Sequence, residues 1–186
     1  LQGLLEQVVQ QAADECLQDY GGVLRSLETA RAKKVLQDWL ALELAREAFS
    51  VRDVEQEYQW AHGPLDLKLR LDRIDELHDG RLAVIDYKAG DSDIGPRSDW
   101  MRTGPVGLQL PFYAAVLAGE DHAVAALVLA RLHARDTKVK GLVDGDYGLD
   151  GLWTLQAWPA FAGYSWTGLM AEWRRTIESL ADEYAA

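Results

Sequence analysis

Apolar residues near the start of the chain recur every three or four positions, which is the period of an amphipathic helix. This pattern predicts one helix over residues 1–19 and a longer one over residues 23–49, separated by Gly21 and Gly22. The apolar stripe of the longer helix comprises Leu24, Leu27, Val35, Leu36, Trp39, Leu40 and Leu44. Charged residues lie beside this stripe, so we expect one helix face to pack on a core.

Beyond residue 50 the period falls to two, which is typical of half-buried strands. We expect strands over residues 51–60, 65–72 and 82–88. In the second of these, a leucine at every other position alternates with a charged residue. Turn-forming residues separate the three strands, namely Gly63-Pro64 and His78-Asp79-Gly80.

The rest of the chain predicts helices and a strand in alternation. We expect a loop over residues 89–104, a helix over 106–117 and a buried strand over 123–132. Residues 133–165 are rich in Gly, Asp and Trp and are expected to be irregular, and an amphipathic helix follows over 166–184. This order of elements is typical of a mixed α/β or α+β domain.

The composition favours one folded domain. With 186 residues, 48% of them apolar, the chain can bury a single core, and we expect residues 1–49 to pack as a helical segment on a core of residues 50–186. No window approaches the roughly 18 unbroken apolar residues of a membrane span, so no membrane partner is expected. Cys16 is the one cysteine, which excludes an iron–sulfur cluster within this chain and favours a reducing, cytoplasmic setting.

The ends of the chain suggest a piece of a longer polypeptide. The first residue is Leu1 rather than Met, no signal peptide follows, and the last helix stops without a capping residue. We therefore expect the remainder of the polypeptide to be a partner of this domain.

The charge balance is acidic, with 19 basic against 30 acidic residues and a net charge of −11. Taken alone, this balance argues against nucleic acid, because phosphate binding depends on Lys and Arg. Carboxylates that hold a divalent cation count as negative until the metal binds, however, so the net charge does not exclude a nucleic-acid substrate.

The most informative residues are Asp72, Asp86 and Lys88. On a strand, Asp86 and Lys88 share a face while Tyr87 points to the other. A three-residue turn at 78–80 brings Asp72 opposite Asp86, within about 5 Å at Cβ. A two-residue turn places Asp72 beside Tyr87 instead, so the pair of carboxylates exists in one register only.

Two carboxylates side by side on half-buried strands repel each other unless one is protonated or a cation lies between them. Ligand sets made of oxygen alone favour a hard ion, Mg²⁺ or Mn²⁺. Lys88 beside such an ion can orient a water or offset charge that develops on a phosphate. Asp75 faces away from Asp72, and we expect it to form a salt bridge to Arg73 or Arg81, or to serve the turn.

Three short strings resemble those of a known family. Residues 70–75 (RLDRID) and 85–90 (IDYKAG) are similar to the strings GRIDRID and IDYKTG of RecB-like exonuclease domains, which belong to the PD-(D/E)XK nuclease superfamily. Residues 109–113 (QLPFY) resemble the Q-x-x-x-Y motif of the same domains. The resemblance implies a restriction-endonuclease-like core, a mixed β-sheet flanked by helices, with the N-terminal helical segment attached.

The resemblance also implies roles for individual residues. Asp72, Asp86 and the backbone carbonyl of Tyr87 would bind the metal, Mg²⁺ or Mn²⁺. An upstream acidic residue often contributes in such domains, and Glu57 or Glu55 on the first strand is the candidate.

Lys88 would be the catalytic lysine. Gln109 and Tyr113, one helical turn apart, would shape the site or hold the substrate strand. In the loop after Lys88, Trp100 with Arg97 and Arg102 would suit stacking and phosphate contacts with single-stranded DNA, although packing within the loop is an equal alternative.

The sequence departs from the family in three places. Leu71 stands where the superfamily has a proline, and no His precedes His62, although RecB-like domains usually carry a metal-binding His in an N-terminal helix. Several relatives hold an iron–sulfur cluster, for which Cys16 alone is insufficient. The missing histidine and cysteines fit a chain trimmed at both ends.

These observations predict a Mg²⁺-dependent, exonuclease-like domain that hydrolyses DNA phosphodiester bonds in repair or recombination. The expected partners are single-stranded DNA or duplex ends, the rest of the polypeptide and a helicase. The alternative is a catalytically inactive, nuclease-derived module that binds DNA or protein, which the acidic net charge and the missing histidine keep open.

Overall fold

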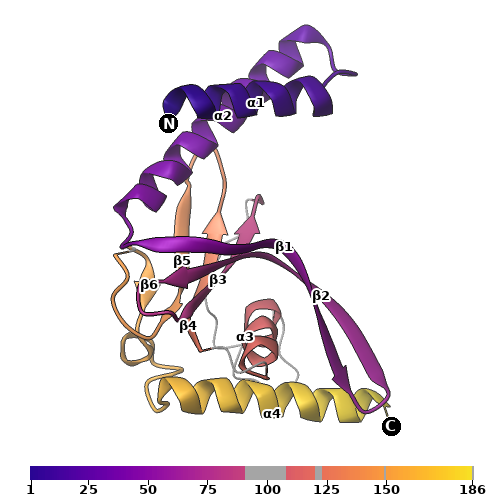
Figure 1. The fold of residues 1–186 in the computed structure, drawn as a ribbon, viewed down its shortest axis with the longest axis vertical. Helices are drawn as coiled ribbons and strands as arrows, with labels where there is room; N and C mark the ends of the chain where they lie inside the picture. Colours follow the sequence, from indigo (N-terminus) through magenta and orange to yellow (C-terminus); the bar gives the residue numbers. More distant parts are fainter. Residues whose placement is uncertain (91–107, 120–122, 149, 186) are drawn as a thin grey trace.

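The computed structural model describes residues 1–90, 108–119, 123–148 and 150–185 (Figure 1). The helices are α1 (Gln2–Cys16), α2 (Gly22–Ala45), α3 (Gln109–Gly119), the short 3₁₀ helix η2 (Leu155–Ala157) and α4 (Trp166–Ala185). The strands are β1 (Phe49–His62), β2 (Leu65–Leu77), β3 (Leu82–Lys88), β4 (Val124–Arg131), β5 (Lys138–Val143) and β6 (Leu152–Trp153). None of the described helices is both long enough and apolar enough to span a membrane.

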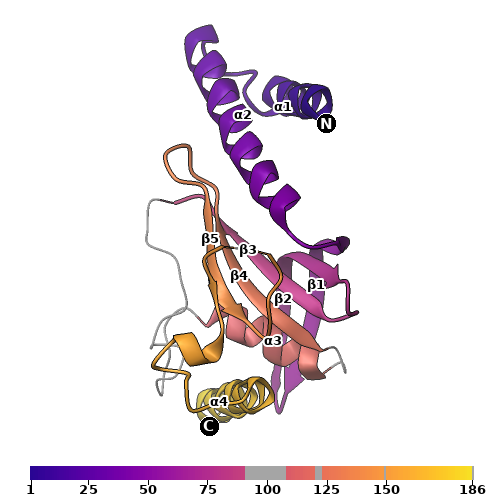
Figure 2. The same ribbon diagram turned by 90° about the vertical axis from the view of Figure 1, so that its left-hand side faces the viewer.

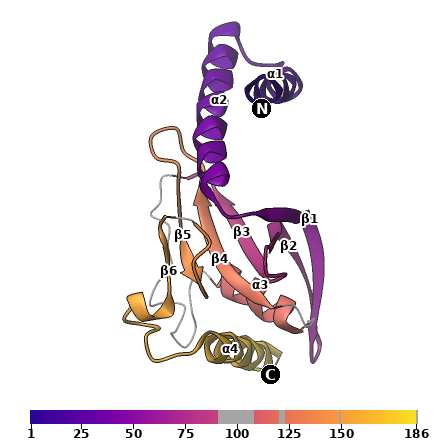
Figure 3. The same cartoon turned by 60° about the vertical axis from the view of Figure 1, so that its left-hand side comes forward.

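All six strands form one mixed sheet, in the order β1-β2-β3-β4-β5-β6. The pairs β3–β4 and β5–β6 are parallel and the other three pairs are antiparallel. Helices α3 and α4 lie on one side of the sheet, and α2 descends to the other side from the hairpin that it forms with α1 (Figures 1 and 3). The expected mixed α/β sheet with helices on its faces and N-terminal helices is confirmed.

The expectation that residues 133–165 are irregular is wrong, because this segment contains β5, β6 and η2. The glycines that suggested a loop are needed where neighbouring backbones approach closely. A Cβ at Gly141 would lie 1.9 Å from the Leu127 carbonyl oxygen, and one at Gly151 would lie 2.3 Å from that of Val139. These glycines therefore permit strand pairing. Glycine usually interrupts strands and helices, so the sequence alone suggested a loop here.

Several predicted boundaries also shift. Helix α2 ends at Ala45 rather than at residue 49, and β1 already begins at Phe49. Strand β2 continues beyond Asp72 to Leu77. Helix α3 begins at Gln109, whereas residues 106 and 107 of the predicted helix lie outside the described residues.

The hydrophobic core consists of two clusters, one on each side of the sheet. Under α3 and α4, the buried residues include Leu71, Ile74, Val84, Leu110, Leu127, Leu142, Leu169 and Trp173. On the α2 side they include Trp39, Leu77, Ile85, Ala126, Val128 and Val139. Strands β3 and β4 contribute to both clusters, which explains why they are apolar throughout most of their length.

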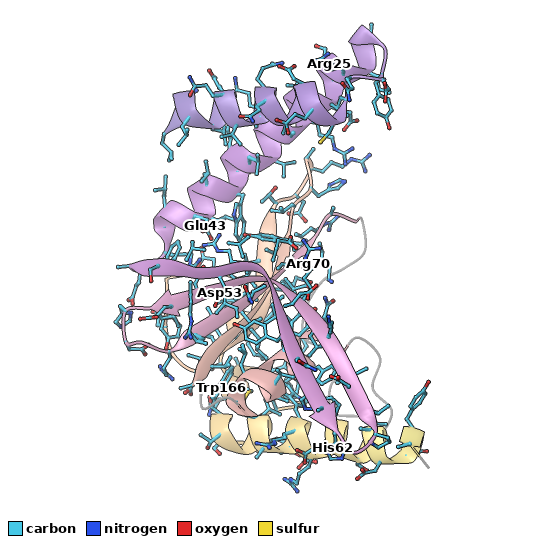
Figure 4. The ribbon with its side chains drawn as sticks, turned by 45° about the vertical axis from the view of Figure 1, so that its right-hand side comes forward. Arg25, Glu43, Asp53, His62, Arg70 and Trp166 are labelled. Atoms are coloured by element: carbon cyan, nitrogen blue, oxygen red, sulfur yellow. The ribbon has the colours of Figure 1, made fainter. Side chains whose placement is uncertain are left out.

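A buried ionic network joins the end of α2 to β2. Asp75 is fully buried and accepts hydrogen bonds from Arg73 Nε at 2.7 Å and from Arg46 Nη1 at 2.7 Å. Glu43, near the lower end of α2 (Figure 4), accepts a hydrogen bond from Arg73 Nη2 at 2.6 Å. Burial disfavours the charge of Arg73, but the hydrogen bonds and charge of Asp75 outweigh it and raise the pKa of Arg73. The expected salt bridge of Asp75 to Arg73 is thus confirmed.

Replacing Asp75 with asparagine is expected to lower the free energy of unfolding by about 3–5 kcal/mol, because two buried guanidinium groups lose a charged partner. Urea unfolding followed by circular dichroism measures this difference, with an unchanged dependence on urea concentration showing that the unfolded surface is the same. Glu178→Gln on α4, which removes an exposed pair with Arg174, is the matched control and should cost less than about 1 kcal/mol. Equal losses in the two variants would contradict a structural role for the network.

Candidate functional site

The turn between β2 and β3 has the register that brings Asp72 to Asp86. Leu77 donates its N–H to the Arg81 carbonyl at 2.8 Å, and Gly80 has φ +80°. Arg73 consequently pairs with Ile85. In the same register, residues 84, 83 and 82 of β3 pair with residues 74, 75 and 76 of β2. The predicted three-residue turn is confirmed, and Asp72 lies directly beyond the last paired residues.

Asp72 reaches across to β3. Its Oδ2 accepts a hydrogen bond from the backbone N–H of Tyr87 at 2.8 Å. Leu71 and Ile74 both lie in the cluster under α3, although residues three apart on a regular strand face opposite sides. The regular alternation of side chains along β2 is therefore interrupted near Asp72. At this irregularity the Asp72 carboxylate turns towards β3.

The neighbouring strand shows the same irregularity. Val54 pairs with Arg73 and Gln56 pairs with Leu71, and Glu55 between them has φ +54°. A non-glycine residue in this left-handed region is strained, and such strain concentrates at functional sites. Opposite Asp72, the ribbon of β1 and β2 thus departs from ideal geometry.

Asp86 is almost completely buried, with 1% of its surface exposed. Lys88 Nζ lies 2.6 Å from Asp86 Oδ2, but this oxygen has no partner with hydrogen-bond geometry among the described residues. Burial raises the pKa of Asp86, Lys88 opposes the shift, and the charge of Asp72 adds to it. Asp72 is bonded to the backbone N–H of Tyr87, the residue next to Asp86, so the two carboxylates lie on neighbouring parts of β2 and β3.

A chain of hydrogen bonds connects Lys88 to helix α3 and back to β2. Lys88 Nζ donates to Gln109 Oε1 at 2.9 Å, and Gln109 Nε2 donates to the Tyr113 hydroxyl at 2.8 Å. Tyr113 in turn donates to the carbonyl oxygen of Arg70 at 2.8 Å. Burial raises the pKa of the Tyr113 hydroxyl. The structure thus brings Gln109 and Tyr113 to the predicted site.

The sequence does not predict the contact of Tyr113 with the backbone carbonyl of Arg70, since no side-chain pattern reports where a main-chain oxygen points. Tyr87 is also more than a backbone ligand candidate. Its hydroxyl accepts a hydrogen bond from Arg73 Nη1 at 3.1 Å, and its ring packs edge-on to Trp39 with centroids 5.5 Å apart. Strand alternation places Tyr87 on the other face of the sheet from Asp86, and this is the signal that could have located the contact.

The third acidic ligand remains a prediction. Glu55 forms an ion pair with Arg70 at 2.5 Å, and Glu57 is exposed and pairs in register with Arg70. Across the part of the chain that the structure describes, no three His, Cys, Asp or Glu residues come together as a metal cluster. Arg97, Trp100 and Arg102 lie outside the described residues.

The groups present nevertheless fit a hard divalent cation. Asp72 and Asp86 supply carboxylate oxygens, and Asp86 Oδ2 is a buried charged atom without a hydrogen-bond partner among the described residues. Lys88 Nζ, 2.6 Å from this oxygen, compensates its charge in part, and a divalent cation would add to this compensation. Oxygen donors are the ligands that Mg²⁺ and Mn²⁺ prefer.

One of three comparisons with known proteins agrees with this chemistry. The sequence model of the PD-(D/E)XK nuclease superfamily matches residues 1–186. A search of curated proteins finds no match. The crystal structure of SSO0001 is similar over 94% of this chain and 85% of that chain, with 15% sequence identity and a TM-score of 0.30, values too low to inform the site.

Titration with Mn²⁺, followed by electron paramagnetic resonance, should reveal one tight site that Asp86→Asn removes, because the variant loses a ligand charge. An acidic protein also collects Mn²⁺ weakly over its surface, so Asp14→Asn, which alters an exposed carboxylate on α1, is the control and should retain the tight site. Coincident titration curves for wild type and Asp86→Asn would exclude the Asp72–Asp86 pair as a metal site.

Proposed function

Because the chain belongs to the PD-(D/E)XK nuclease superfamily, we propose that it is a nuclease of the RecB-like type that hydrolyses DNA phosphodiester bonds with a divalent metal ion. The proposal extends to an exonuclease-like activity on single-stranded DNA or duplex ends in repair or recombination. With Cys16 as the one cysteine, the proposed setting is the reducing cytoplasm.

The observation that carries this proposal is the meeting of Asp72, Asp86 and Lys88 where β2 and β3 separate. Asp72 is bonded to the Tyr87 N–H, and Lys88 lies against Asp86. Two carboxylates and a lysine in this arrangement combine a metal site with a positive group for a phosphate.

Asp72, Asp86 and the carbonyl of Tyr87 would hold the metal. A bound Mg²⁺ supplies Lewis-acid stabilisation of the charge that develops on the phosphate during hydrolysis. Burial raises the pKa of Asp86, and a bound cation would stabilise the charged form of this carboxylate.

Lys88 is the residue proposed to orient the attacking water and to offset charge on the phosphate. Its Nζ is located by two groups, Asp86 Oδ2 at 2.6 Å and Gln109 Oε1 at 2.9 Å. The side chain remains 39% exposed, so the ammonium group is accessible to a substrate. Gln109 and Tyr113 act through Lys88 and are therefore positioning residues.

The single substitution Lys88→Ala is expected to abolish metal-dependent cleavage of DNA while leaving the fold intact, because the carboxylates keep their strand positions. Cleavage of labelled single-stranded and duplex oligonucleotides measures the activity, and circular dichroism checks the fold. Lys68→Ala, on the exposed part of β2, is the matched control and should cleave like wild type. Undiminished cleavage by Lys88→Ala would refute the assignment, and a wild type that binds DNA without cleaving it would favour the inactive binding module.

Gln109→Ala removes the acceptor that orients Lys88 and should lower kcat by roughly 10- to 100-fold, the value of a hydrogen bond to a charged group. The metal concentration at half-maximal activity should stay unchanged, because Gln109 is not a proposed ligand. Gln109→Glu retains an acceptor oxygen for Lys88 but loses the donor to Tyr113, so it should recover part of the rate. An equal loss in both variants would point to damage to α3 instead of mispositioning of Lys88.

A further inference from the structure

Lys88 is the first of three cationic residues that lie side by side across the sheet. In the parallel pair of β3 and β4 it is in register with Arg131, and in the antiparallel pair of β4 and β5 Arg131 is in register with Lys138. Residues directly opposite each other on adjacent strands project to the same face. The three side chains therefore share the face that carries Asp86.

A second row repeats this arrangement one step along the strands. Asp86 is in register with Leu129, and Leu129 with Lys140. Leu129 packs against the core cluster under α3, which identifies the face. Val139, between the two lysines, is 3% exposed and belongs to the cluster on the α2 side. Strand alternation thus places both Lys138 and Lys140 on the face of the candidate site.

Among the described residues, β5 pairs with β6 only from Gly141 onward, so Lys138 and Lys140 lie on a part of β5 that β6 does not cover. The hairpin of β4 and β5 projects beyond the body of the sheet (Figure 2). Neighbouring strands are about 4.8 Å apart, so Lys138 lies roughly 10 Å from Lys88 along the row. A DNA strand rises about 3.4 Å per nucleotide, so this span corresponds to about three nucleotides.

The local charge is opposite to that of the whole chain. Residues 131–140 contain four basic residues and a single acidic one, whereas the whole chain has a net charge of −11. The basic residues are Arg131, Arg135, Lys138 and Lys140, and the acidic one is Asp136. Asp136 forms ion pairs with Lys138 and, at 3.6 Å, with Arg131. Its carboxylate is 46% exposed, and exposed pairs contribute little stability, so a phosphate can take its place at low cost.

We propose that Lys138 and Lys140, with Arg131 between Lys88 and Lys138, bind the phosphate backbone of the nucleic-acid strand whose scissile phosphate lies at Asp72 and Asp86. This inference rests on the proposed nuclease function and adds to it a direction, in which the bound strand runs across β3, β4 and β5. The competing explanation is that the lysines only protect a partly unpaired strand from pairing with other chains, as edge lysines do.

The test compares Lys138→Ala/Lys140→Ala with wild type in binding a fluorescently labelled single-stranded oligodeoxynucleotide. Anisotropy is measured with Ca²⁺ in place of Mg²⁺, and the probe is checked for integrity afterwards. Loss of two phosphate contacts lowers the slope of log Kd against log salt by roughly 1.4 for a single strand. Between about 50 and about 200 mM salt, wild-type affinity should then fall roughly sevenfold more than that of the variant. Arg174→Ala/Arg175→Ala on α4, which removes two positive charges elsewhere, should retain the wild-type slope.

The outcomes separate the two proposals. A reduced slope supports the interface even if wild type shows no cleavage with Mg²⁺, a result that would instead overturn the nuclease function. An unchanged slope and Kd in the double variant, with wild type cleaving normally, overturns the interface and leaves the nuclease function standing. Equal slope changes in Lys138→Ala/Lys140→Ala and in Arg174→Ala/Arg175→Ala would show a general charge effect and would also overturn the interface.

Discussion

The register of the β2–β3 hairpin is the constraint on which the candidate site depends. Because side chains alternate across a strand, a slip of one residue would move Asp72 from the face of Asp86 to the opposite one. The three-residue turn prevents this slip, with Gly80 at φ +80° and the Leu77 N–H bonded to Arg81. A residue with a Cβ adopts this backbone conformation rarely, so a glycine in the turn has a structural reason.

Both faces of the hairpin are used, and for different purposes. On one face, Arg73 and Asp75 form a buried ionic network with α2, and the Tyr87 hydroxyl joins it. On the other face, the carboxylates of Asp72 and Asp86 lie just beyond the last paired residues of β2 and β3. Since adjacent residues of the same two strands serve the two faces, the network that holds α2 also restrains the backbone that carries the site.

The burial of Asp86 sets the chemistry of the site. A buried carboxylate that lacks a full set of hydrogen bonds is unfavourable, and the pKa of Asp86 is raised accordingly. Lys88 compensates this charge in part, and the chain from Gln109 through Tyr113 to the Arg70 carbonyl holds Lys88 in place. The same burial and crowding of charge that would destabilise an ordinary hairpin make this one suited to a divalent cation and a phosphate.

The sequence alone predicted the hairpin and the shared face of Asp86 and Lys88, because strand periodicity and turn chemistry are local properties. It left two registers open, and the bond from the Leu77 N–H to the Arg81 carbonyl in the structure decides between them. It also indicated the expected ion pair of Asp75 with Arg73, which are two residues apart. It did not predict β5, since Gly141 is required by the close backbone of Leu127, a neighbour distant in sequence. The same holds for the contact of Arg46 with Asp75, the bond of Tyr113 to Arg70, and the alignment of Lys138 with Lys88. Only tertiary structure decided these features, because each depends on strands and helices that meet after long connections, where no local periodicity relates one residue to the other.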